Sequence, residues 1–270
     1  MKLILSRKGF DSSNGKCPSP ILPDGTLLSL PIPSDESDAD TYSSLQWNGK
    51  TFDEIICSLR PKTSLRANSF CHLDPDIRAD VRERSKEWQP AFGQRNSALS
   101  VLRNNGVGKG DLFLFFGWFK ETEYAPNGKL RYKSNAPDLH IIYGYMQIGS
   151  IIEKKEAVPV GLIEHPHVSY NDSWAKNQNA LFIPSPTLSS LQLNIKGCDV
   201  LNYREDRVLT KRGYSRGRWD LPSFFEFENV KITYHPDPWK NSYFQSACIG
   251  QEFVMDATPE IIEWARKIIV

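Results

Sequence analysis

The chain has 270 residues, of which 40% are hydrophobic, and a formal net charge of +1 at pH 7. No run of about 18 apolar residues exists, which excludes a membrane-spanning helix, and the first residues are too short an apolar stretch for a signal peptide. Five cysteines, an odd number without C-x-x-C spacing, exclude a disulfide framework and a zinc site made of cysteines alone. We therefore expect a cytoplasmic protein with reduced thiols, in which a local basic stripe would suffice for binding nucleic acid.

The N-terminal part predicts a mixture of short strands and helices. Residues 2–6 and 26–32 are typical of strands, with a loop rich in Ser, Gly and Pro between them. Apolar residues recur at helical spacing in 52–59 and again in 97–104. Gly106 follows the second of these helices as its C-terminal cap.

Two long segments rich in aromatic and β-branched residues, 108–120 and 139–152, predict a central β-hairpin. Each has an interior glycine, which in a strand marks a bulge, a bend or a close approach. The polar tongue between them, residues 121–138, contains an Asn-Gly turn signal.

The aromatic residues of this hairpin are expected to pack on one face of the sheet. Alternation along the strands would then leave the opposite face free to line a pocket. We count the following as candidate pocket residues: Trp118, Tyr143 and Tyr145.

The C-terminal half predicts strands at 159–163, 180–183 and 225–233, and then a helix with Thr258 as N-cap and Pro259 at its first position. Strands outnumber helices and do not alternate with them in a βαβ rhythm. This pattern predicts an α+β protein with a bent, mostly antiparallel sheet or barrel-like core, flanking helices and a C-terminal helix. We expect residues 1–270 to form a single domain.

The sequence resembles the nucleotide modification associated domain 3 family of bacteria and phages. The resemblance runs through most of the chain, and its motifs are specific only together. They are Ser6–Ser13, Pro18–Ile21, Ser29–Pro33, His72–Asp76, Phe92–Gln94, Gly106–Gly108, Gly110–Phe119 and His165–His167. The family is associated by genomic context with systems that make or handle modified DNA bases, so the resemblance implies a nucleotide, or DNA containing a modified base, as partner. No settled catalytic residues carry over from it.

A second likeness covers residues 106–152 only. A Gly-Asp pair before an aromatic strand, followed by a strand with a glycine-containing turn, is similar to PUA-like barrels that read modified bases. It is an analogy of fold and implies no activity.

His72 and Asp74 form a His-x-Asp triplet. Iron(II)/2-oxoglutarate oxygenases use such a triplet with a distant histidine as a facial triad. No arginine closely follows the histidines that would complete it, although that superfamily usually has one to hold 2-oxoglutarate. The candidate third ligands are His140, His165, His167 and His235.

The alternative for this triplet is structural. His72, Asp74 and Asp76 would then form a turn or a cap that leads into residues 77–81. On the functional hypothesis the same three residues are catalytic candidates.

His165 and His167 flank a proline, and in an extended segment both imidazoles would point to the same face. With a carboxylate they could hold zinc or iron, so we expect a metal site formed by His72, Asp74, His165 and His167. The alternative is an exposed turn.

The remaining candidates are ligand-binding residues in two basic segments and at a helix start. Residues 6–13 could offer cations and backbone N–H groups to a phosphate, or be a solvated loop, and residues 211–219 interleave four cations with two aromatic rings. An amide at the start of the second helix could contact a base edge or cap that helix. The candidates are Arg7, Lys8, Asp11, Gln94, Tyr214, Arg216, Arg218 and Trp219.

Three functions remain open from the sequence. The first is a metal-dependent enzyme, containing Fe(II) or zinc, that acts on a nucleotide or a modified base, for instance as an oxygenase. The second is a non-catalytic reader that uses an aromatic pocket and the basic stretch. The third is a protein-interaction module that exposes Tyr124 and Tyr132 on the tongue.

Overall fold

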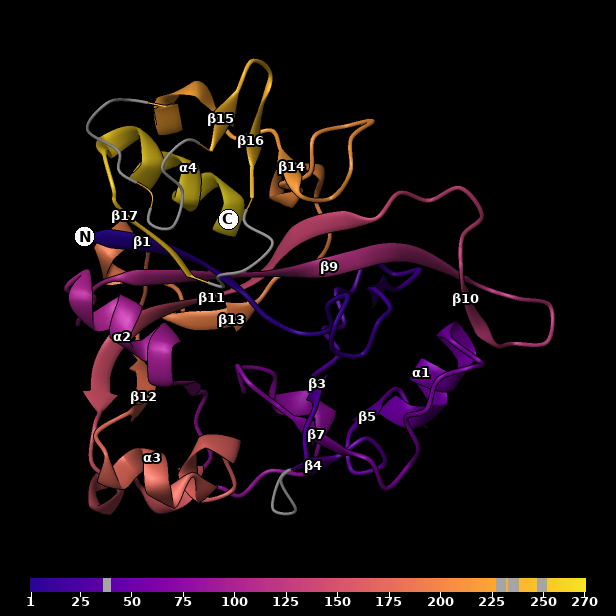
Figure 1. Cartoon of the computed structure of the whole chain (residues 1–270), viewed down its shortest axis with the longest axis horizontal. Coiled ribbons are helices and arrows are strands. Elements are labelled where there is room, and N and C mark those ends of the chain that lie inside the picture. Colours follow the sequence, from indigo (N-terminus) through magenta and orange to yellow (C-terminus); the bar gives the residue numbers. More distant parts are fainter. Residues whose placement is uncertain (36–39, 227–231, 233–237, 247–251) are drawn as a thin grey trace.

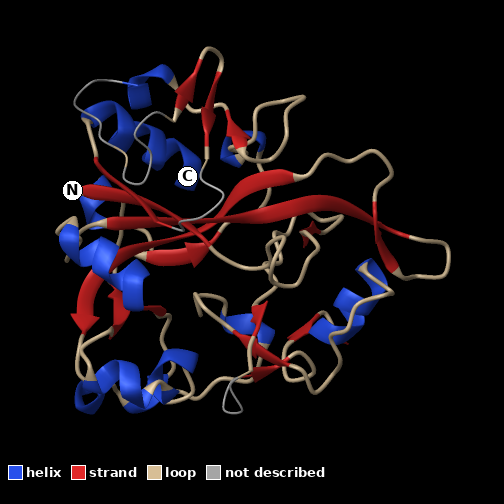
Figure 2. Ribbon diagram, viewed as in Figure 1, coloured by secondary structure: helices blue, strands red, loops and turns tan. Residues whose placement is uncertain are grey.

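The computed structural model describes residues 1–35, 40–226, 232, 238–246 and 252–270. A nine-stranded, curled sheet runs through the molecule, and its two longest strands cross the centre (Figure 1). Figure 2 shows helices on both sides of these strands. The predicted α+β class is confirmed.

The main sheet has the order β17-β1-β9-β11-β12-β8, with β2 and β10 beside β9 and β13 beside β11. Only the β1–β9 and β2–β9 pairs are parallel, so the predicted predominance of antiparallel pairing is confirmed. Its strands are β1 (Lys2–Arg7), β2 (Ser19–Ile21), β8 (Phe92–Arg95), β9 (Leu112–Tyr124), β10 (Leu130–Tyr132), β11 (Leu139–Ile152), β12 (Asn179–Pro184), β13 (Cys198–Val200) and β17 (Glu252–Asp256).

Three small sheets lie outside this one. They are formed by β3 (Ile32–Pro33), β4 (Asp40–Thr41) and β7 (Phe70–His72); by β5 (Gln46–Trp47) and β6 (Lys50–Thr51); and by β14 (Arg218–Trp219), β15 (Trp239–Lys240) and β16 (Tyr243–Gln245). The α-helices are α1 (Phe52–Leu59), α2 (Asn96–Asn104), α3 (Asn171–Ala175) and α4 (Pro259–Ile269).

The predicted central hairpin is confirmed as β9 and β11, but our assignment of its faces is wrong. Ile142 pairs with Phe116 and Gly144 pairs with Phe115, so one residue of β11 is left over. This β-bulge reverses the alternation of side chains. Tyr143 therefore packs in the core on one face and Tyr145 in the core on the other.

Each face of the hairpin has its own core, and neither face as a whole is left open to line a pocket. On one face, leucines of β9 pack with α4 and with the aromatic residues of β14 and β16. On the other, β9 and β11 pack against β8, β12 and α2. The predicted helices at 52–59, at 97–104 and at the C-terminus are confirmed, and the Thr258 Oγ1 atom accepts the Ile261 N–H at 3.4 Å.

Two predicted strands are wrong. In residues 26–32, Leu27 forms only an isolated bridge, and Ile32 alone belongs to a strand. Pro31 has no backbone N–H to donate to a neighbouring strand. Residues 160–162 form a 3-10 turn in which Val160 is 74% exposed and Leu162 is buried, so this apolar run packs through single residues of a turn and not as a strand. The strand at 180–183 is confirmed as β12.

Several expectations are tested only in part. Of the predicted strand 225–233, Phe225 lies in a 3-10 turn at Ser223–Glu226, and most of the remainder falls outside the described residues. No helix in the described ranges is long and apolar enough to cross a membrane. The single domain over 1–270, the cytoplasmic location and the likeness to PUA-like barrels stay predictions.

Candidate functional site

A polar cavity of about 340 Å³ opens where the end of β1 meets β3, β7 and β8. The predicted His-x-Asp triplet and the basic candidate segment of residues 6–13 both contribute to it. It is lined by Arg7, Lys8, Gly9, Asp11, Asn14, Ile32, Pro33, Ser34, Asp35, His72, Asp74, Gln94, Arg95, His167 and Tyr170.

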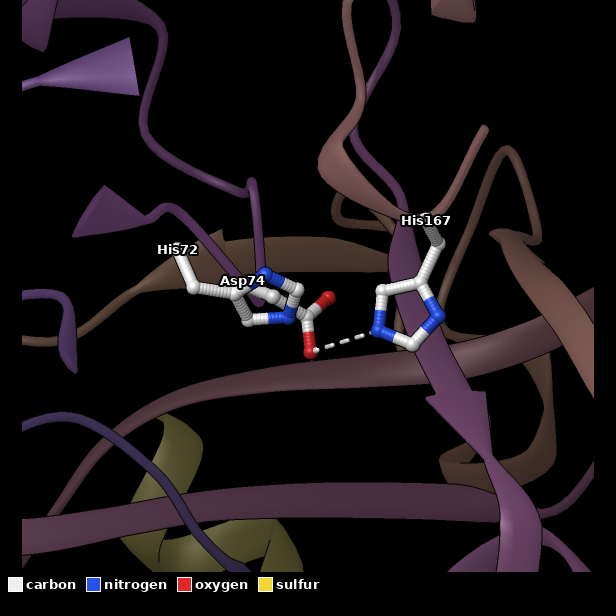
Figure 3. Close-up of side chains that lie close together, drawn as sticks. All are labelled: His72, Asp74 and His167. Carbon is white, nitrogen blue, oxygen red and sulfur yellow. Dashed lines mark ion pairs between the residues drawn. The ribbon is translucent and has the colours of Figure 1, made fainter. Parts of the chain in front are cut away.

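Three potential metal ligands meet in this cavity. His72 ends β7, Asp74 follows two residues later, and His167 comes from a 3-10 turn, η4 (Pro166–Ser169). One ligand atom of each residue lies within 4.8 Å of the other two. Figure 3 shows both imidazole rings beside the carboxylate of Asp74.

The Asp74 carboxylate is buried and held from two sides. The Gly93 backbone N–H donates to Oδ1 at 2.6 Å, and His167 Nε2 lies 3.9 Å from Oδ2. Burial alone would raise the pKa of this carboxyl, but the N–H of His165 and the nearby His167 and His72 more than offset it, so the pKa lies well below its usual range. Asp74 is therefore a carboxylate at neutral pH.

His167 is fixed in one neutral tautomer by Asn179. The Asn179 side-chain N–H donates to the His167 carbonyl at 2.7 Å, which turns the amide oxygen towards the ring. Its Nδ1–H then donates to that oxygen at 2.8 Å, and Nε2 keeps its lone pair on the side of Asp74. Burial lowers the pKa of His167 to about 3, which keeps the ring neutral.

His72 is oriented by Tyr170, whose hydroxyl lies 3.2 Å from Nδ1. The guanidinium of Arg95 lies on the face of the Tyr170 ring, 3.6 Å from its centre. Burial lowers the pKa of His72 to about 4, so this imidazole too is neutral and able to bind a metal at neutral pH.

His165 stands behind the carboxylate and is only 3% exposed. Its Nδ1 accepts the His167 N–H at 3.3 Å, so the ring proton belongs on Nε2. Nε2 lies 3.5 Å from Asp74 Oδ1, at the outer limit for a hydrogen bond, and has no other partner among the described residues. The His-Pro-His segment is a 3-10 turn, not the extended segment that we assumed, and both imidazoles nevertheless reach Asp74.

Among the ligand-binding candidates, three line the cavity but are already engaged. The ammonium of Lys8 lies 3.0 Å from the carboxylate of Glu252, which also accepts from the Gln94 amide at 2.6 Å. Asp11 Oδ1 accepts the N–H of Ser13 at 2.7 Å, as in an Asx-turn. The Arg7 guanidinium lines the cavity, and this side chain has no hydrogen bond or ion pair to the described part of the chain.

Asp76, predicted as catalytic, does not line the cavity. Its carboxylate oxygens accept from the Arg84 guanidinium at 2.5 and 2.7 Å, and one of them accepts from the Trp88 indole at 3.2 Å. The structure thus gives it a role in holding residues 76–88 together. His140 is also elsewhere, since its Nδ1 accepts from the Trp219 indole at 3.0 Å, and His235 lies outside the described residues.

The hairpin candidates do not form an aromatic cage at this cavity. The Trp118 indole donates to Asp138 at 2.9 Å, and Tyr145 donates to the Lys196 carbonyl at 3.0 Å. Tyr143 borders only a separate cavity of about 30 Å³ on the other side of Asp74.

The basic stretch at 211–219 divides into a buried and an exposed part. Trp219 is fully buried in the core. Arg216 stacks on Trp118 at 4.0 Å and donates to the Ser12 hydroxyl, which brings the stretch next to residues 11–14 of the cavity wall. Tyr214 packs beside Tyr243, and Arg218 lies 5.1 Å from the centre of the Tyr243 ring.

Sequence reasoning missed Gly93, Tyr170 and Asn179, which support the ligands, and Glu252, which pairs with Lys8 in the cavity wall. A Cβ at Gly93 would lie 2.2 Å from the His167 ring, so only glycine leaves room for that imidazole. The family resemblance could have pointed to Gly93, because this glycine lies in one of the shared motifs, Phe92–Gln94. No pattern in the sequence pointed to Tyr170 or Asn179.

Two imidazoles and one carboxylate are a donor set that suits Zn²⁺ or Fe²⁺ and leaves coordination positions open. The neutral histidines, the ionised Asp74 and the fixed tautomer of His167 are all suited to binding such a metal ion. The chain matches the family model described as nucleotide modification associated domain 3 over residues 2–256. No curated protein and no solved structure matches this chain.

Proposed function

Because the chain belongs to the nucleotide modification associated domain 3 family, we propose that it is a metal-dependent enzyme acting on a nucleotide or a modified DNA base. His72, Asp74 and His167 would hold the ion. The observation that carries this proposal is the convergence of three ligand atoms, within 4.8 Å of one another, on a polar cavity. Structural histidines in a core do not require such a cavity.

A metal ion with three protein ligands can bind water, oxygen or a substrate atom at its open positions. Zinc would imply hydrolysis through an activated water. Fe(II) would imply oxygen chemistry, for instance of the 2-oxoglutarate type. The arginines that such a co-substrate would need do not follow the distal histidine in sequence, but Arg7 and Arg95 line the same cavity.

The alternative, a reader of modified bases, receives less support from the same geometry. Two of the rings that would form its stacking pocket, Trp219 and Tyr145, are buried in a hydrophobic core. A base could not stack on them without opening that core.

The test is a product assay with the metal-loaded protein. Protein reconstituted with Zn²⁺, or anaerobically with Fe²⁺ and then supplied with oxygen and 2-oxoglutarate, is incubated with nucleotides and with DNA containing modified bases. Liquid chromatography and mass spectrometry of the nucleosides should show a product that disappears in His72→Ala and His167→Ala and persists in the control His140→Gln. A product formed equally by the His167→Ala protein would contradict the assignment of the metal ligands.

A further inference from the structure

We propose that Arg7 and Arg95 form an anion-binding subsite in the cavity, which takes a phosphate or carboxylate group of the molecule that reacts at the metal. The inference rests on the proposed function and narrows it. It predicts that a nucleoside 5′-phosphate binds the cavity and that the corresponding uncharged nucleoside does not.

Arg7 is the first part of the argument. It ends β1, it is partly buried, and it lines the cavity. Its guanidinium makes no ion pair or hydrogen bond to any residue that the structure describes, whereas the side chain of the neighbouring Lys8 is paired with Glu252 at 3.0 Å. A partly buried cation without a counter-charge is unfavourable, and an incoming anion would relieve this cost.

Arg95 is the second part. Its guanidinium stacks on Tyr170, which leaves the N–H groups in the plane of the guanidinium without a protein acceptor among the described residues. Such a pre-oriented fork suits two oxygens of a phosphate or carboxylate.

The Tyr170 ring joins this arginine to the metal ligands. Its hydroxyl contacts His72 Nδ1 at 3.2 Å, and the Arg95 guanidinium lies on the face of the same ring, 3.6 Å from its centre. An anion held by Arg95 would therefore lie close to the proposed metal centre. A substrate whose charged group is bound by Arg95 could therefore place its reacting atom at the metal ion.

The carboxylates of the cavity do not neutralise these arginines. Asp74 faces the histidines, and Asp11 is occupied by backbone N–H groups of its own loop. Asp35 also lines the cavity, but it forms no ion pair with either arginine. The subsite thus keeps two guanidinium groups for a ligand.

Isothermal titration calorimetry of the metal-loaded full chain tests the proposal. The probes are a mixture of the four deoxynucleoside 5′-monophosphates, the matching deoxynucleosides, inorganic phosphate and 2-oxoglutarate. We expect at least one anionic probe to bind and the deoxynucleosides to bind at least 10-fold more weakly than the monophosphates. Binding of 2-oxoglutarate alone, lost with the arginines, would assign the subsite to a dicarboxylate co-substrate.

The variants Arg7→Gln and Arg95→Gln should each weaken binding of the anion at least 10-fold. The matched control is Arg131→Gln, which removes an exposed arginine paired with Glu123 on the tongue and should leave the affinity unchanged. Equal affinity in all three variants, or no binding of any anionic probe at millimolar concentration, would overturn the subsite.

A separate comparison distinguishes this inference from the proposed function. In metal-free His167→Ala protein, anion binding that still depends on Arg7 would uphold the subsite. If, in addition, the wild-type protein bound no metal, the proposal of a metal-dependent function would be contradicted and the anion-binding subsite would still be supported.

Discussion

His167 lies against Gly93 with no room for a methyl group between them. A Cβ at position 93 would stand 2.2 Å from the imidazole, although the backbone there has an ordinary φ. Gly93→Ala should therefore displace a ligand and weaken Zn²⁺ binding by about 10-fold or more. A competition titration with a chromogenic chelator measures this.

The matched control for that variant is Gly108→Ala. A Cβ at Gly108 would meet nothing within 4 Å, and this glycine also has no positive φ. Unchanged Zn²⁺ affinity in Gly93→Ala would remove His167 from the set of ligands.

His140 is a buried histidine outside the candidate site, and it makes stability depend on pH. Burial, with Arg216 and Arg7 nearby, lowers its pKa to about 3 in the folded protein, against about 6.5 in the unfolded chain. The unfolded state binds the proton more readily, so stability present above pH 6.5 is lost as pH falls towards 3. By pH 5 the loss is about 2 kcal/mol.

Urea denaturation of chelator-treated protein at pH 7 and pH 5 measures this loss. In His140→Gln the difference between the two pH values should shrink by about 2 kcal/mol. Some dependence should remain, because burial also lowers the pKa of His72 and His167. An unchanged difference would mean that His140 is not kept neutral by the fold.

At the level of elements, a buried ion pair beside the cavity ties the residue that follows β1 to the first residue of β17. Lys8 and Glu252 have side chains that are 8% and 1% exposed, and Gln94 of β8 joins the same carboxylate. Glu252→Ala leaves the ammonium buried and unpaired, which should cost about 3–5 kcal/mol of unfolding free energy.

The double variant Lys8→Met with Glu252→Leu should recover most of that loss, since it removes both charges. Chemical denaturation of Lys8→Met, Glu252→Leu and the double variant gives the coupling between the two residues. Additive losses would mean that the two groups do not interact across β1 and β17.

How far the elements could be predicted depended on their regularity. The 3.6-residue period of α1 and α4 and the aromatic runs of β9 and β11 were sufficient to identify them. The interior glycine Gly144 indicated a bulge, a bend or a close approach without distinguishing them, so the reversal of faces at the bulge between Ile142 and Gly144 was not predictable. A short apolar run such as 159–163 does not show which of its residues are buried, and in the structure Leu162 is buried while Val160 is exposed.

For the molecule as a whole, the candidate site joins residues about 90 positions apart in the chain. In the sequence, His72 with Asp74 and His165 with His167 are two separate pairs. The prediction of one shared site rested only on the ability of imidazoles and a carboxylate to bind the same metal ion. The side chains that orient them, Tyr170 and Asn179, act through contacts that only the fold creates.

The central hairpin of the main sheet contributes to the cores on both of its faces, so we expect one cooperative unfolding transition for the whole chain. Differential scanning calorimetry of metal-free protein should give equal calorimetric and van't Hoff enthalpies. Two resolved transitions would contradict the prediction of a single domain over 1–270.

The central claim is that His72, Asp74 and His167 bind a metal ion. The most direct measurement is elemental analysis of protein purified without a metal-binding tag, beside His167→Ala and the control His140→Gln. We predict one equivalent of zinc or iron, as isolated or after reconstitution, in the wild type and in His140→Gln, and loss of that ion in His167→Ala. Protein that binds no metal even after reconstitution, or that binds it equally without His167, would contradict the account.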